Sequence, residues 1–192
     1  MTSTMSKSFG AGALLYPQTV YMIGTYGEDG TPDVMNAAWG GIAGEDRVAI
    51  CLDRTHKTTE NLKRTRAFTV SPATVDTVVP CDYLGIVSAY KVPDKVARSG
   101  LHVERASKVD APRVKELPLV AECEVVNYDE ETEILIGRIV DIVADDSILT
   151  DGKIDPVKLR PIAYDASMHG YYAMTEKVGT AWKSGSVLMR RS

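Results

Sequence analysis

The segment that decides the fold reads VMNAAWGGIAGEDRVAICLDRTHKTTENLKRTRAFTVS and occupies residues 34–71. Three short apolar runs, over residues 33–39, 47–52 and 67–71, each have the length and composition of a β-strand. A polar, cationic and hydroxyl-rich stretch between the second and third runs predicts a helix over 56–66. A strand end followed by Arg, His, Lys and two Thr at a helix N-terminus has the chemistry needed to hold a phosphate group.

Further strand patterns lie on both sides of this segment. Residues 19–25 are β-branched and aromatic, and the Gly-Glu-Asp-Gly turn at 27–30 leads from them into 33–39 as a hairpin. Gly40, Gly41 and Gly44 are expected to break the chain before the strand at 47–52. The other expected strands cover 119–128 with 132–143 (the clearest hairpin), 161–164 and 171–175; a second helix is expected over 74–84, and a loop over 85–100.

This order of elements predicts a mainly β fold. Strands follow one another through short turns, and no alternation of strands and helices is present, so a parallel sheet is not expected. We therefore predict a closed antiparallel β-barrel with short helices. The first turn of the predicted helix has no capping box, which leaves Asp53 or Thr55 as a single N-cap.

Length and composition limit the possible classes of protein. A chain of 192 residues with 44% apolar and 25% charged residues is typical of one globular domain, expected here over 1–192 with a loose N-terminal arm at 1–13. The net charge of −4 weighs against nucleic acid as a partner. No apolar run is long enough for a membrane or a signal peptide, and three scattered cysteines favour a reducing cytoplasm.

Several familiar motifs are missing. The run Gly10-Ala11-Gly12 begins like a dinucleotide fingerprint but follows no strand, and neither a P-loop nor a G-x-S-x-G elbow is present. The histidines His56, His102 and His169 are dispersed, as are the cysteines. We therefore predict no metal site and name no catalytic residue.

The cationic cluster has two interpretations. Taken alone, Arg54, His56, Lys57, Thr58 and Thr59 are explained somewhat better by a polar loop with a helix cap than by an anion site. The strand before the cluster raises a similar question. Asn36 either finds hydrogen-bond partners or faces outward from a strand edge, and Trp39 belongs to the core or to an interface.

Four ordered blocks resemble a known family. The residues Asn36–Gly40, Arg54–Thr58 and Ala67–Ser71, and the region from Asp82 to Leu101 with its Asp94-Lys95 pair, are similar to the flavin reductase-like family, and within it to flavoredoxins. The resemblance runs from about Tyr16 to Met174. It implies an antiparallel Greek-key split β-barrel that binds FMN near the interface of a homodimer.

The resemblance also assigns residues. It places Asn36, Ala37, Ala38 and Trp39 beside the flavin ring and the ribityl chain. It places Arg54, His56, Lys57, Thr58 and Thr59 around the phosphate. Ser71 is a further candidate for cofactor binding, although family members often carry Asn there, and Ala89 stands where they often carry Gly.

The resemblance implies hydride transfer from NADH or NADPH to FMN, or electron transfer with a redox partner protein. Hydride transfer needs no side-chain acid or base. The segments 85–88 and 168–172 are expected to line the exposed face of the flavin. Two alternatives remain open: an oxidase similar to the pyridoxamine phosphate oxidases, and a non-catalytic flavin-binding module.

Overall fold

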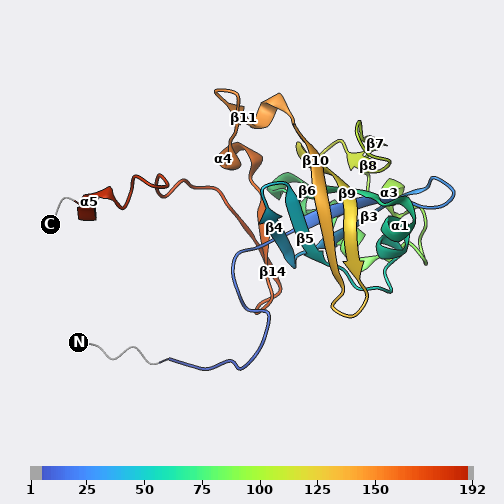
Figure 1. Cartoon of the computed structure of the whole chain (residues 1–192), viewed down its shortest axis with the longest axis horizontal. Helices are drawn as coiled ribbons and strands as arrows, with labels where there is room; N and C mark the ends of the chain where they lie inside the picture. Colours follow the sequence, from blue (N-terminus) through green and yellow to red (C-terminus); the bar gives the residue numbers. More distant parts are fainter. Residues whose placement is uncertain (1–5, 190–192) are drawn as a thin grey trace.

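The frame of the molecule is a curled antiparallel sheet of seven strands in the order β3-β2-β6-β9-β10-β5-β4. The computed structural model describes residues 6–189, and Figure 1 shows its ribbon. The strands of this sheet are β2 (Tyr21–Tyr26), β3 (Pro32–Ala37), β4 (Gly40–Gly44), β5 (Arg47–Cys51), β6 (Ala67–Pro72), β9 (Leu119–Asp129) and β10 (Ile134–Ala144).

The sheet is a barrel with one seam left open. Strands β3 and β4 are the two edges of the sheet, yet only Ala38 and Trp39 separate them in the chain. Three peptide units span at most about 11 Å, so the sheet must curl until its two edges lie close together. The mainly β, split-barrel prediction is confirmed, and the seam lies at the residues expected beside the flavin.

Two apolar clusters lie on opposite faces of the curled sheet. The barrel interior contains Ile23, Ile50, Phe68 and Leu135, all at most 1% exposed, and Leu62 of helix α1 (Lys57–Thr65) joins them. The outer face is covered chiefly by helix α2 (Val78–Ile86), which packs on β3. Helix α1 therefore packs on the inner cluster, and α2 packs on the outer one.

Two sequence expectations need correction. Gly40, Gly41 and Gly44 do not break the chain, because they form β4 and pair with β5. A Cβ on Gly40 would lie 2.9 Å from the carbonyl oxygen of Ala49, so glycine permits this close pairing. The expected loop over 85–100 contains a short helix, α3 (Lys95–Arg98), which the burial of its first two residues anchors.

The remaining elements lie around the barrel. The expected strands at 161–164 and 171–175 form β13 and β14, which pair in a small sheet with β1. Their bounds are β1 (Gln18–Thr19), β7 (Val103–Arg105), β8 (Pro112–Val114), β11 (Leu149–Thr150), β12 (Lys153–Ile154), β13 (Ile162–Asp165), β14 (Gly170–Ala173), α4 (Pro156–Leu159), α5 (Ser186–Met189), and the 3-10 turns η1 (Val75–Thr77) and η2 (Asp146–Ile148).

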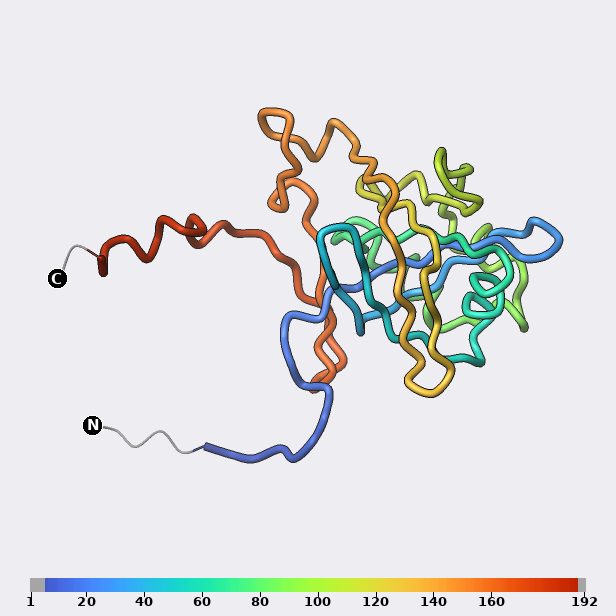
Figure 2. Tube along the Cα trace, viewed as in Figure 1, coloured from blue at the N-terminus to red at the C-terminus, as the bar shows by residue number. Residues whose placement is uncertain are grey.

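Two terminal arms leave the body on the same side (Figure 2). Residues 6–15 and 174–189 are exposed throughout. The loose N-terminal arm expected at 1–13 stays a prediction, and its residues 1–5 lie outside the described part of the chain. None of the helices in the described residues is both long enough and apolar enough to cross a membrane.

Candidate functional site

The first turn of α1 leaves its main-chain amides free. The N-cap residue His56 is extended and its side chain caps nothing. Among the described residues, the amides of Lys57, Thr58 and Thr59 donate to no acceptor. The expected single cap is wrong, because the Asp53 carboxylate instead accepts from the amide and hydroxyl of Thr55, at 2.7 and 2.6 Å. These bonds lower the pKa of Asp53.

The two threonines of this turn point inward. Thr58 and Thr59 are at most 1% exposed. The Thr58 hydroxyl donates to Asp33 Oδ2 at 2.5 Å, and the Thr59 hydroxyl donates to the carbonyl oxygen of Asp53 at 2.8 Å. Their side chains therefore fix the helix to its surroundings, while their amides keep the positive end of the helix dipole available.

The three basic residues of the cluster, Arg54, His56 and Lys57, are more loosely held. Arg54 and His56 are exposed, and Arg54 Nε lies 3.8 Å from a carboxylate oxygen of Glu133. Lys57 pairs with Glu60, and its Nζ lies 5.4 Å from the centre of the Tyr90 ring. An exposed ion pair of this kind costs little to exchange for another anion.

Tyr90 lies in the loop that faces α1 and contacts Lys57 and Glu60 of that helix. Its hydroxyl donates to Glu60 Oε2 at 2.6 Å. This bond and partial burial raise the pKa of Tyr90 to about 12, so the phenol stays protonated at neutral pH. The Lys57 ammonium, followed by Tyr90, lowers the pKa of Glu60.

The strand end at the seam is organised by close packing. Asn36 is half-buried and its Nδ2 donates to the carbonyl oxygen of Cys81 at 3.4 Å, a long bond. A Cβ on Gly85 would lie 2.2–2.4 Å from the Asn36 amide, so α2 carries glycine where the Asn side chain lies against it. Ala37 and Ala38 are half-buried, whereas Trp39 is 56% exposed.

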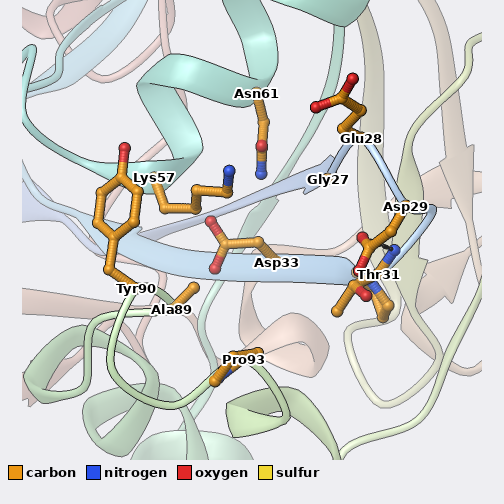
Figure 3. A pocket seen from close by; sticks show the side chains of 11 residues that line it. Gly27, Glu28, Asp29, Thr31, Asp33, Lys57, Asn61, Ala89, Tyr90 and Pro93 are labelled. Atoms are coloured by element: carbon orange, nitrogen blue, oxygen red, sulfur yellow. Dashed lines mark hydrogen bonds between the residues drawn. The ribbon is translucent and has the colours of Figure 1, made fainter.

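Two adjoining cavities lie between the start of α1, strand β3 and the end of α2 with the loop that follows it. A cavity of about 280 Å³ is lined by Asn36, His56, Lys57 and Thr58 together with residues 84–89. A neighbouring cavity of about 530 Å³ shares Asp33, Lys57 and Ala89 with it. Figure 3 shows Asp33, Lys57 and Tyr90 among the residues that line the larger cavity, with Tyr90 beside Lys57.

The structure brings only some of the predicted residues to the smaller cavity. Four line it, and residues 37–39 continue from Asn36 along the seam. Thr59 lies in the first turn of α1, and Arg54 lies three residues before that helix. Ser71 is buried in β6 and is separated from Asn36 by Met22 of β2, so it lines neither cavity. Of the two segments expected to face the flavin, 85–88 lines the cavity, whereas Met168 and Tyr172 line a separate groove.

Sequence reasoning missed two charged residues of the site. Asp33 and Lys95 line the smaller cavity and are 3% and 2% exposed. Asp33 was visible only as the start of a strand, and Lys95 only as part of a family-like pair. A buried charge is not distinguishable in sequence from a solvated one unless its partner is known.

Comparisons with known proteins show the family and the fold of the chain. The family model of the flavin reductase like domain matches residues 13–166. Flavoredoxin of Desulfovibrio vulgaris (Miyazaki F) is 35% identical, with a TM-score of 0.90 over 94% of this chain and 100% of that chain. No curated protein matches the chain.

More distant structures share the fold. Flavoredoxin from Methanosarcina acetivorans is 24% identical, with a TM-score of 0.84 over 97% of this chain and 99% of that chain. An FMN-binding protein from Thermus thermophilus is 17% identical, with a TM-score of 0.74 over 94% and 99% of the two chains. The match of the family model over most of the chain, together with the 35% identical flavoredoxin, shows that this protein belongs to the flavin reductase-like family of FMN-binding split barrels.

Proposed function

We propose that this protein is a flavin oxidoreductase that holds FMN at the seam of the barrel and takes electrons from NADH or NADPH. The observation that carries the proposal is the uncapped first turn of α1, whose residues share a cavity with Asn36. Family membership supports FMN as the ligand.

The start of α1 is suited to hold the phosphate group of FMN. Three free amides and a helix dipole form an anion-binding arrangement, and the exposed side chains of Arg54 and His56 flank it. Lys57 exchanges its partner Glu60 for phosphate in this proposal. The hydroxyls of Thr58 and Thr59 orient the turn and are not the primary donors, because each already donates to a protein oxygen.

The end of strand β3 is suited to hold the flavin ring, which is flat and has a polar edge. Strand β3 is an edge strand, so peptide groups on its open side have no partner strand. The end of β3 and Ala38 therefore offer main-chain groups next to the exposed indole of Trp39, whose own carbonyl oxygen already accepts from the amide of Cys51 at 2.8 Å. The Asn36 side chain is turned toward α2 and orients the strand; it does not supply the main contact.

Bound FMN supplies the hydride chemistry, and the chain supplies binding, orientation and access. The histidines form no acid–base set: His102 pairs with Glu116 at 2.7 Å, His169 contacts Tyr164 at 2.9 Å, and His56 stands at the helix start. We therefore assign no catalytic side chain.

We also propose a homodimer with the seam at its interface. Trp39, Ile42, Tyr90 and Trp182 are large side chains that are 54–101% exposed, and an interface between two copies of the chain would cover such surface. Tyr83 of α2 is not among them, because it packs against the outer core cluster. A stable dimer would bury upwards of about 2,000 Å² in total. Sedimentation at micromolar concentration tests this, and a monomer that retains FMN would contradict it.

The function is tested in two steps. The purified protein is heated to release any chromophore, and the mass of the released compound is compared with that of FMN. The bound flavin is then mixed anaerobically with NADH, with NADPH and with dithionite in a stopped-flow instrument. Bleaching by a nicotinamide nucleotide supports the reductase. Bleaching by dithionite alone indicates an electron carrier fed by another protein, and a protein that binds no flavin contradicts the proposal.

A further inference from the structure

A buried lysine occupies the wall of the proposed phosphate cavity. The side chain of Lys95, the first residue of α3, is 3% exposed. Its Nζ donates to the carbonyl oxygens of Leu84 and Val87, each at 3.1 Å, and lies 3.1 Å from Asp33 Oδ1. Asp33 Oδ1 accepts no aligned hydrogen bond, so this third contact is an ion pair.

Asp33 extends these contacts to α1. Its second oxygen, Oδ2, accepts the hydrogen bond from Thr58, whose amide belongs to the uncapped turn. Lys95 also binds carbonyl oxygens at the C-terminal end of α2, where a cation is favoured by the helix dipole. One continuous set of buried contacts therefore joins the first turn of α1, strand β3 and the start of the loop 87–94.

Stability alone does not account for a lysine at this place. A buried ion pair is often no more stabilising than well-packed apolar side chains of similar volume. Every contact of the Lys95 ammonium is made with a group that lines the smaller cavity. None is made with residues 36–39, which form the other end of the candidate site.

We propose that Lys95 is a positioning residue for the phosphate end of the FMN site, an inference that rests on the proposed function. Through Asp33 and Thr58 it fixes the first turn of α1, and through the carbonyl oxygens of Leu84 and Val87 it fixes the facing loop. The separation of these two walls determines whether the free amides reach a phosphate. Lys95 thereby sets the preference of the protein for FMN over riboflavin.

The test compares FMN and riboflavin affinities of flavin-free protein, measured by quenching of flavin fluorescence. Lys95→Met is expected to weaken FMN binding about tenfold or more and riboflavin binding by less than about threefold, because charge-assisted bonds to phosphate are lost. The matched control is Lys91→Met, an exposed lysine of the same loop. It removes the same charge and is expected to leave both affinities unchanged.

A double variant separates positioning from charge and from misfolding. Asp33→Asn with Lys95→Met keeps the net charge of the wild type and leaves no unpaired buried charge, so it remains measurable if the single variant does not fold. It is expected to retain the selective loss of FMN affinity. Restored FMN affinity in the double variant, or an equal loss for both flavins in the single variant, would overturn the proposal.

Hydrogen exchange of the flavin-free protein distinguishes this proposal from the proposed function. Faster exchange at the hydrogen-bonded amides of Glu60, Val87 and Val92 is expected in Lys95→Met and not in Lys91→Met. Unchanged exchange in Lys95→Met would contradict the positioning role even if FMN binds. Conversely, a wild-type protein that binds no FMN refutes the proposed function, while the exchange result still decides whether Lys95 holds the two walls.

Discussion

The two ends of the candidate site are built on different principles. At the start of α1, free amides lie among cationic and hydroxyl side chains, and a buried ion pair stands behind them. At the strand end, residues 36–39 are mostly apolar, and close packing between Asn36 and Gly85 fixes their position. One end is organised by charge, and the other by shape.

The motif side chains nevertheless behave alike at both ends. Thr58 and Thr59 donate to protein oxygens, and Asn36 lies against α2, so each serves the fold. The main chain beside them stays available for a ligand. Substitutions at the α1 end should therefore affect FMN and not riboflavin, whereas substitutions at the strand end should affect both flavins equally.

The largest effect is expected from Gly85→Ala at the strand end. The new Cβ would overlap the Asn36 amide, and overpacking of this kind costs about 1–3 kcal/mol. We expect both FMN and riboflavin to bind more weakly, by about 5- to 150-fold if the strain falls on the bound state. Titration with each flavin measures this.

Gly41→Ala provides the control, because a Cβ there meets no atom within 4 Å. A loss confined to FMN in Gly85→Ala would show that the strand end does not contact the ring.

At the α1 end, Arg54→Ala should weaken FMN binding by about tenfold and leave riboflavin unchanged. A charge-assisted bond contributes about 1.5–3 kcal/mol, and the lower value applies because the Arg54 side chain is 63% exposed. Paired titrations with the two flavins measure the difference. Arg138→Ala, at an exposed arginine of β10, is the control, and equal weakening of both flavins by Arg54→Ala would remove this residue from the phosphate.

Glu60→Gln tests the Lys57–Glu60 ion pair, which Lys57 exchanges for phosphate in the proposed function. Because the pKa of Glu60 is lowered in the folded protein, its stabilisation is present above the ordinary value of 4.5 and is lost as pH falls through the lowered value. Thermal unfolding of the flavin-free variant should differ from wild type by less than about 1 kcal/mol at pH 7, and the difference should shrink below pH 4.5. A difference that does not depend on pH would contradict the ion pair.

The smallest effect is expected from His102→Ala and His169→Ala. Neither residue lines the two cavities. The limiting rate of flavin bleaching should stay within about tenfold of wild type, because loss of a general acid or base costs about 10²–10⁴-fold. Stopped-flow measurement decides this, and a larger loss would place an acid–base group at the site.

Local alternation and turn signals predicted an antiparallel barrel, but a closed one. The open seam between β3 and β4 was implied only by the family resemblance, because local patterns do not encode which strands stay unpaired. Sequence alone did not predict β4, since glycine permits a close strand pairing that only the neighbouring strand reveals. The cationic cluster was visible, but the inward turn of Thr58 and the Lys95–Asp33 pair depend on residues far apart in the chain. The place of Ser71 away from the cavity follows from strand order, which its local pattern does not encode.

The central claim is that the amides at the start of α1 hold the phosphate of FMN. The most direct test records the amide resonances of Lys57, Thr58 and Thr59 during titration with FMN and, separately, with riboflavin. Large shifts with FMN and small ones with riboflavin are predicted, while residues 36–39 respond to both flavins. Equal responses of the three amides to FMN and riboflavin, or no response to FMN, would contradict the claim.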